Sequence, residues 1–154
     1  MSDNKLALIA IGGNSLIKDK AHQSVDDQYQ TALETCRNIA SVIEKGWRVV
    51  VTHGNGPQVG FILLRSELSR ASLHEVPLVS CVADTQGAIG FHLQMGLHNA
   101  LLERGRAVEV ATVVTQCVVD AADKAFQNPT KPIGLFYSKE EAEKAMAERG
   151  WTMV

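Results

Sequence analysis

The sequence has few of the features that mark disulfide-rich or metal-binding proteins. It contains only three cysteines, Cys36, Cys81 and Cys117, which are odd in number and widely spaced. This pattern indicates neither a disulfide framework nor a four-thiolate zinc site, and we expect each cysteine to be a small buried apolar residue. The histidines and carboxylates show no metal-ligand spacing either, so the sequence predicts no metal site among its residues.

The signatures of several large enzyme classes are absent as well. The chain has no GxGxxG and no GxxxxGKS/T pattern, which disfavours a nicotinamide enzyme or a P-loop ATPase, and it has no GxSxG hydrolase elbow. Its 15 Lys and Arg residues against 17 Asp and Glu give a formal net charge of −2, with no basic block. We therefore expect no nucleic-acid or membrane partner, but a small molecule or another protein.

Long apolar runs are missing too. The apolar run from Leu6 to Ile11 is short and follows an acidic residue, Asp3, which fits a buried strand better than a signal peptide. We expect a cytoplasmic protein. With 154 residues, of which 45% are hydrophobic and 21% charged, the chain has the composition of one ordinary globular domain.

The first third of the chain predicts a strand, a helix and a second strand joined by short links. Residues 6–11 form an apolar strand, and Ser24 with Asp27 begins a helix whose apolar residues recur at helical spacing up to Gly46. A second strand follows at residues 48–52. This order is typical of a right-handed parallel crossover unit in an α/β fold.

Three further helices are predicted. They cover residues 57–70, residues 80–103, and a last stretch that a capping box of Ser138 and Glu141 begins and Gly150 ends. Each glycine inside a helix costs about 1 kcal/mol relative to alanine, so close packing must offset it. The helix predicted at residues 80–103 contains Gly87, Gly90 and Gly96. Core packing and a subunit interface are equally good explanations for these glycines.

The remaining segments complete the expected sheet and leave one excursion. Residues 107–120 are predicted as one or two strands, too apolar to lie on an edge, so the sheet should have at least three strands. Residues 121–136 contain two prolines and no helical period, which predicts a long, ordered and protruding loop. Because residues 151–154 begin an apolar element that stays unfinished, we expect the fold to continue beyond them.

Two glycine turns follow the first two predicted strands. Ligands bind at the carboxyl ends of parallel strands, so turns on neighbouring strands should face one crevice. Their backbone N–H groups, with the positive end of the helix that Pro57 begins, describe a cradle for an oxyanion such as phosphate or carboxylate. Gly54 and Gly56 are expected to permit backbone angles that other residues resist. The candidate residues are Gly12, Gly13 and Asn14 in one turn and Gly54, Asn55 and Gly56 in the other.

Lys131 is the candidate catalytic residue. It lies between two prolines, which reduce the entropy lost when the side chain is placed, and a fixed ammonium could neutralise charge during phosphoryl transfer; a solvated surface lysine is an equal alternative. His53 precedes the second turn and is expected to be a hydrogen-bonded structural residue. Helix capping and solvation explain the acidic residues Asp84, Asp120 and Asp123 as well as an acid/base or magnesium role does.

Four segments in the same order resemble the successive signatures of carbamate kinases and carbamate kinase-like proteins, members of the amino-acid kinase superfamily. They are AIGGNSL, THGNGPQVG, ADTQGAIGF and NPTKPIGLFY. The resemblance covers essentially the whole chain but only about the N-terminal half of the usual family length. It differs from many members at Ser15 and around the helix with ADTQGAIGF, which is compatible with a kinase-like paralogue.

The resemblance implies a three-layer α/β/α sandwich on a mainly parallel sheet, incomplete at its C-terminus, and a homodimer. It also implies reversible phosphoryl transfer between ATP and carbamate, giving ADP and carbamoyl phosphate, with Mg²⁺. Residues 1–154 would be the carbamate-binding half, in which the two glycine turns hold the acceptor and Lys131 closes over it. Most of the nucleotide site would lie in the C-terminal half that this chain lacks, so the 154 residues alone should be inactive.

Two other readings of the chain remain open. It could be a noncatalytic dimerisation or anion-binding module that uses the glycine-bearing helix at residues 80–103 as its interface. It could also be part of a superfamily kinase that acts on another small carboxylate.

Overall fold

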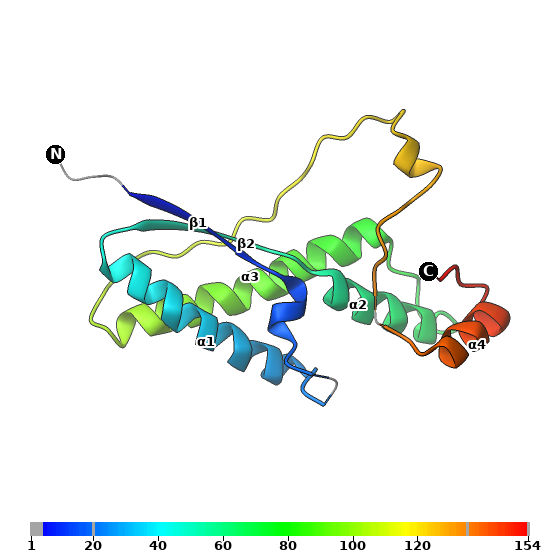
Figure 1. Cartoon of the computed structure of the whole chain (residues 1–154), viewed down its shortest axis with the longest axis horizontal. Helices are drawn as coiled ribbons and strands as arrows, with labels where there is room; N and C mark the ends of the chain where they lie inside the picture. The colour runs from blue at the N-terminus through cyan, green and yellow to red at the C-terminus, as the bar shows by residue number, and fades with distance from the viewer. Residues whose placement is uncertain (1–4, 20, 135, 154) are drawn as a thin grey trace.

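The computed structural model describes residues 5–19, 21–134 and 136–153. The predicted NPTKPIGLFY segment and the excursion at residues 121–136 therefore include one residue, Leu135, that lies outside the described part. Figure 1 shows the order of the elements. The strands are β1 (Leu6–Ile11) and β2 (Arg48–His53), the α-helices are α1 (Val25–Glu44), α2 (Gly56–Ser69), α3 (Leu78–Leu102) and α4 (Lys139–Arg149), and two 3-10 turns are η1 (Gly13–Leu16) and η2 (Lys124–Phe126).

The predicted crossover unit is confirmed. β1 and β2 pair in parallel, from Leu6 opposite Arg48 to Ile11 opposite His53, and α1 connects them. Ser24 and Asp27 form the predicted capping box at the start of α1. Parallel neighbours need such a helical connection because a tight turn cannot join them. The chain is therefore an α/β protein with a short parallel sheet.

One face of this sheet lies on the core. The side chains of Ile9, Ile11, Val49 and Val51 pack against a cluster built mainly from α1 and α3, and Figure 1 shows these two helices along one side of the strand pair. The buried cluster includes Ala32, Cys36, Ile39, Ala40, Ile89, Leu93, Leu97, Ala100 and Leu101. Burial of apolar surface contributes roughly 25 cal/mol of stabilising free energy per Å², and it holds the strands and helices together.

The other face of the sheet is open. The side chains of Leu6, Leu8 and Val50 are 55%, 70% and 47% exposed. The sequence predicts strands that are covered on both faces, whereas the described residues provide a helical layer on one face only. The complete three-layer sandwich is thus not seen in this part of the chain.

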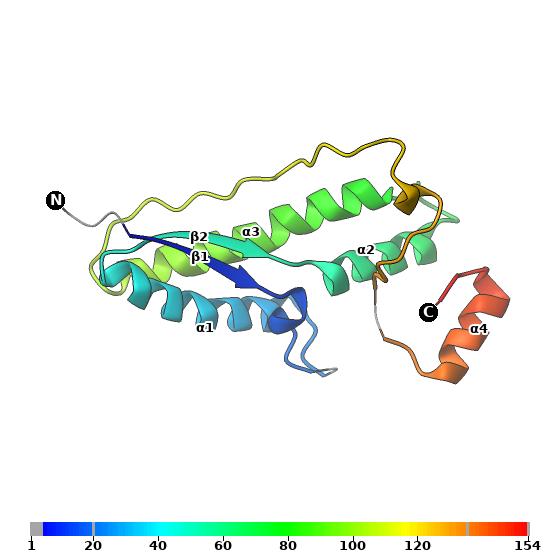
Figure 2. The ribbon, with the colours of Figure 1, turned by 45° about the horizontal axis from the view of Figure 1, so that its top comes forward.

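The prediction of one or two strands at residues 107–120 is wrong. This segment runs extended across the molecule, but the sheet of the described residues contains only β1 and β2 (Figure 2). Val108 and Val110 pack against the core, whereas Val113 and Val118 are exposed. High apolar content indicates a need for burial but names no partner, and a strand forms only where a neighbouring backbone supplies N–H and C=O groups.

The glycines of α3 serve packing within the chain at two of three positions. A side chain at Gly90 would lie 2.2 Å from Cγ2 of Thr112, whose hydroxyl donates to the Gly90 carbonyl at 2.9 Å. A side chain at Gly96 would lie 3.3 Å from Sγ of Cys36 on α1. Gly87 has no neighbour within 4 Å. Core packing is therefore confirmed for Gly90 and Gly96, and Gly87 remains open.

The C-terminal ends of α1 and α3 are tied together by one arginine. Arg104, just after α3, donates to the hydroxyl of Ser41 at 2.9 Å and to the carbonyl of Arg37 at 3.0 Å, and it forms an ion pair with Glu44. The guanidinium thereby uses its fork of donors on one stretch of α1. This contact fixes the two helices at the end that is remote from the glycine turns.

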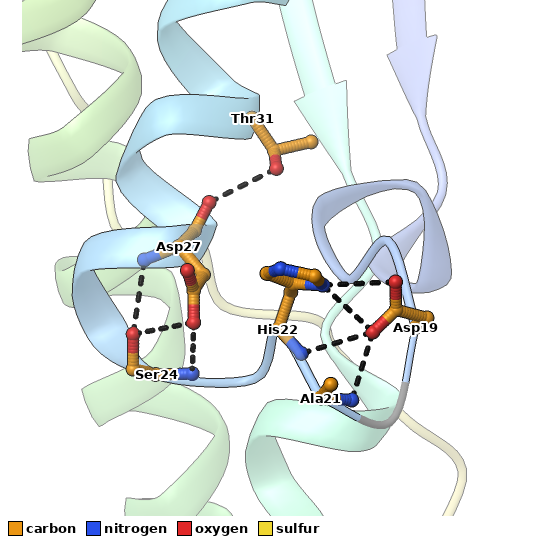
Figure 3. A network of polar contacts seen from close by, with 6 residues as sticks. All are labelled: Asp19, Ala21, His22, Ser24, Asp27 and Thr31. Carbon is orange, nitrogen blue, oxygen red and sulfur yellow. Dashed lines mark hydrogen bonds and ion pairs between the residues drawn. The ribbon is translucent and has the colours of Figure 1, made fainter.

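A compact turn precedes α1, as Figure 3 shows. The carboxylate of Asp19 accepts hydrogen bonds from the N–H groups of Ala21 and His22 and lies 2.8 Å from Nδ1 of His22. The bond to the His22 side chain is the largest cause of the lowered pKa of Asp19. Asp19 thus binds Ala21 and His22 shortly before the Ser24 cap.

The C-terminal part ends in α4. Ser138 and Glu141 form the predicted capping box, and Gly150 ends the helix in the left-handed conformation at φ 68°. Residues 121–133 before it are exposed and contain only η2 as a regular element. No helix among the described residues is long and apolar enough to cross a membrane.

Candidate functional site: two glycine turns in contact

The two glycine turns lie against each other, as their positions after neighbouring strands predict. A Cβ atom on Gly13 would lie 3.0 Å from the backbone nitrogen of Asn55 and 3.0 Å from the carbonyl carbon of Gly54. The Gly54 N–H donates to the Ile11 carbonyl at 2.8 Å, which extends the pairing of the strands by one rung. The backbones of both turns therefore meet at the carboxyl edge of the sheet.

Gly13 and Gly54 are required for close approach and not for unusual backbone angles. Among the described residues, only Gly46, Gly105, Gly134 and Gly150 have positive φ. The expectation that Gly54 and Gly56 adopt angles that other residues resist is therefore wrong. The lack of a side chain is what matters, because a Cβ atom at Gly13 or at Gly54 would press on the backbone of the other turn.

The first turn continues into η1, which begins at Gly13 with Gly12 as its N-cap residue. The Ser15 N–H donates to the Gly12 carbonyl at 2.9 Å, and the Ile17 N–H donates to the Asn14 carbonyl at 3.1 Å. Asn14 is exposed, and Gly12 would tolerate a Cβ atom with only the Ser15 hydroxyl oxygen nearby, at 3.2 Å. Of this turn, Gly13 makes the closest contact with its neighbour.

The second turn leads directly into α2. The helix begins at Gly56, one residue before its predicted start, with Pro57 in its first turn. Asn55 is the N-cap residue, but its side chain makes no capping hydrogen bond. The N–H groups of a first helical turn have no partner within the helix, and the helix dipole adds partial positive charge there. The arrangement thus offers donors to an anion at the edge of the sheet.

Two buried polar residues that the sequence analysis did not single out support these turns. Gln58 is 7% exposed, and its Nε2 donates to the Gly13 carbonyl at 3.3 Å and to Oε1 of Gln28 on α1 at 3.1 Å. Thr85 on α3 is 2% exposed and accepts a hydrogen bond from Nδ2 of Asn55 at 2.8 Å. Both residues lie inside motifs quoted in the sequence analysis. A polar residue in such a motif could have been recognised as a candidate for a buried hydrogen bond.

Lys131 is not brought to the turns by any contact between described residues. Its side chain is exposed, between η2 and α4. Three residues later, however, Gly134 adopts φ 107° and lies against α2: a Cβ atom on Gly60 would be 2.3 Å from the Gly134 Cα. The excursion therefore returns to the helix that begins at the second turn, and the catalytic role of Lys131 stays a prediction.

Three of the other candidates, His53, Asp120 and Asp123, lie within hydrogen-bond distance of nearby backbone groups. Nδ1 of His53 lies 3.2 Å from the Gly54 carbonyl oxygen, within hydrogen-bond distance. The carboxylates of Asp120 and Asp123 accept hydrogen bonds from nearby backbone N–H groups, and Asp84 is exposed. In residues 5–19, 21–134 and 136–153, no group of three or more His, Cys, Asp or Glu side chains is placed to hold a metal ion.

The cysteines differ from one another. Cys36 and Cys81 are buried as predicted, and burial raises the pKa of the Cys36 thiol to about 11. Cys117 is exposed, so the expectation of a buried residue is wrong there. It lies in the segment whose predicted strand pairing the structure does not contain.

Comparison with known proteins finds relatives along nearly the whole chain. No family model matches. The carbamate kinase of Pyrococcus horikoshii is 44% identical over 149 residues, which cover 95% of this chain and 47% of that protein. A carbamate kinase-like protein of Escherichia coli K12 is 45% identical over 146 residues, which cover 92% of this chain and 46% of that protein. The chain spans about half the length of the relatives it matches.

Solved structures give the same result. Carbamate kinase from Giardia lamblia bound to citric acid matches with a TM-score of 0.89 and 38% identity, covering 96% of this chain and 47% of that one. The same enzyme bound to AMP-PNP matches with a TM-score of 0.81 and 37% identity, covering 99% and 48%. The likeness therefore holds in sequence and in fold over the same half.

Proposed function

Because this chain is a homologue of carbamate kinases over the N-terminal half of their length, we propose that it is the acceptor-binding half of a carbamate kinase-like phosphotransferase. The complete enzyme transfers a phosphoryl group reversibly between ATP and carbamate and gives ADP and carbamoyl phosphate. The observation that carries the proposal is the contact between the Gly13 and Gly54 turns beside an uncapped helix start. Donors that converge in this way suit an oxyanion.

The proposed roles follow from the chemistry of the groups. The turns of Gly12, Gly13 and Asn14 and of Gly54, Asn55 and Gly56 hold carbamate or the transferring phosphoryl group. They use the backbone N–H groups that are not already bonded, which leaves out that of Gly54, because it is donated to the Ile11 carbonyl. The ammonium of Lys131 closes over this site and neutralises negative charge that develops on the phosphoryl oxygens. The Gly60–Gly134 contact supports this role because it brings the excursion back to α2.

The nucleotide and its Mg²⁺ are proposed to bind mostly in the half of the enzyme that this chain does not span. One solved relative is bound to AMP-PNP. The turns of this chain offer backbone donors, which fit an anion, whereas Mg²⁺ needs oxygen ligands and usually enters with phosphates. We further propose that the complete protein has the three-layer sandwich, with its second helical layer over Leu6, Leu8 and Val50.

The test compares this chain with a version extended by the C-terminal half of a carbamate kinase. ATP formation from ADP and carbamoyl phosphate is measured for both, with Lys131→Met in the extended version as the control. We expect turnover by the extended version and none by the 154-residue chain. Robust turnover by the short chain, or a folded extended version that acts only on another small carboxylate, would contradict the proposal.

A second candidate function is dimerisation. α3 has an apolar stripe at spacings of four residues, formed by Val79, Ala83, Gly87 and Phe91. Val79 and Phe91 are 76% and 59% exposed, and Gly87 has open space beside it. Such a face suits a second copy of the chain. Sedimentation of the wild type and of Phe91→Glu tests it: we expect a homodimer that the substitution dissociates, and a monomeric wild type would exclude it.

A further inference from the structure

Helix α2 begins without the cap that its sequence encodes. Asn55 at the N-cap and Gln58 three residues later match a capping box, the arrangement that Ser24 with Asp27 forms on α1. In α2, the Asn55 side chain makes no capping bond, and Oε1 of Gln58 is buried without a hydrogen-bond partner among the described residues. Neither side chain thus makes the bond that a capping box would require.

Thr85 is the residue that holds the Asn55 side chain away from the helix. Its hydroxyl donates its only proton to the Val82 carbonyl at 2.8 Å, so toward Asn55 the oxygen can only accept. The bond from Nδ2 of Asn55, also 2.8 Å, therefore fixes which way the amide faces. Because Thr85 is 2% exposed, water does not compete readily for this position.

The diversion frees one particular donor. A capping Asn accepts a hydrogen bond from the N–H of the second or third helical residue. In α2 the second residue is Pro57, which has no N–H, so the Gln58 N–H is the only donor that Asn55 could cap. An anion that binds at the third position of this helix would take the same N–H group. Capping by Asn55 and anion binding are therefore mutually exclusive at Gln58.

We propose that Thr85 is a positioning residue, which holds the Asn55 amide off the start of α2 and so keeps the Gln58 N–H open for the substrate oxyanion. This inference rests on the proposed function for the identity of the anion. It gives the ADTQGAIGF segment of α3 a role in the site, although that segment does not form either turn.

The test uses Thr85→Val, which replaces the hydroxyl with a methyl group, and Thr85→Ser, which keeps it. Thr31→Val is the matched control, because Thr31 is also buried and also donates to a helix carbonyl, that of Asp27 at 2.9 Å. Two quantities are measured on the 154-residue chain: hydrogen exchange of the Gln58 N–H, and the Kd for inorganic phosphate by NMR titration. The exchange measurement does not depend on any ligand.

In Thr85→Val we expect slower exchange at the Gln58 N–H, because the released Asn55 side chain caps it, and a Kd for phosphate about fivefold higher, the factor that corresponds to a typical N-cap. Thr85→Ser and Thr31→Val should keep wild-type values. Adding Asn55→Ala to Thr85→Val should return the exchange rate to the wild-type level. If Thr85 had only a structural role, Thr85→Val would exchange faster than the wild type, and the double variant faster again.

Unchanged exchange of the Gln58 N–H in Thr85→Val overturns the inference, whether or not phosphate binds. If exchange slows as expected but the wild-type chain binds neither phosphate nor carbamoyl phosphate, the positioning stands and the proposed function fails. Should Thr85→Val not fold, Thr85→Ala is measured in the same way, and equal exchange in Thr85→Ala and the wild type has the same meaning.

Discussion

Substitution of Gly13 by alanine tests the contact between the two glycine turns most directly. The added Cβ atom would lie 3.0 Å from the Asn55 nitrogen, 3.0 Å from the Gly54 carbonyl carbon and 3.1 Å from the Gly54 carbonyl oxygen. Ordinary contacts of this kind are several tenths of an ångström longer, and all three atoms are backbone, which cannot rotate aside. Overpacking of this kind costs about 1–3 kcal/mol.

For a chain of this length that cost corresponds to a fall in Tm of roughly 2–12 °C. Thermal unfolding followed by circular dichroism measures it, with Gly56→Ala as the matched control. A Cβ atom on Gly56 meets nothing within 4 Å and its φ is not positive, so this variant should be neutral or up to about 1 kcal/mol more stable. Equal Tm values for the two variants would refute the argument that close approach requires Gly13.

Three further outcomes are expected. In the extended enzyme, Lys131→Met should lower kcat roughly 100-fold with a small change in Tm. An unchanged kcat would show that Lys131 does not neutralise charge during phosphoryl transfer. Gly60→Ala should also lower kcat, because its Cβ atom would lie 2.3 Å from the Gly134 Cα and displace the segment that carries Lys131; wild-type kcat would contradict this. Native chain at pH 8 should label rapidly with a thiol reagent at exposed Cys117 and not at Cys36, whose pKa of about 11 leaves about one thiolate in a thousand; mass spectrometry of the labelled peptides decides it.

The elements that depend on local signals could be predicted from the sequence. The strand at residues 6–11, the capping boxes at Ser24 and Ser138 and the stop at Gly150 all follow from neighbouring residues, and the structure contains each of them. Residues 107–120 could not be assigned in this way. Their apolar content predicts one or two strands, but strand pairing depends on a partner backbone that the local sequence does not identify.

The contact between the two glycine turns was predictable from the sequence, but the side chains that support the turns were not. Turns after neighbouring parallel strands must meet, so the approach of Gly13 to Gly54 followed from topology alone. The reason for the glycines was wrong, because φ values and steric contact cannot be distinguished in a sequence. Gln58 and Thr85 were missed because a buried hydrogen bond links residues from different elements, and its partners appear only once the chain has folded.

The hydrogen bond from the Gly54 N–H to the Ile11 carbonyl has a consequence for the order of events during folding. It is the last hydrogen bond of a parallel strand pair. These two strands can pair only after the helix between them has brought them together. The proposed anion site would therefore form only after the two strands have paired. A bound anion would in turn stabilise this hydrogen bond and slow the exchange of the Gly54 N–H proton. Anion binding and local opening of the strand ends would then be thermodynamically linked.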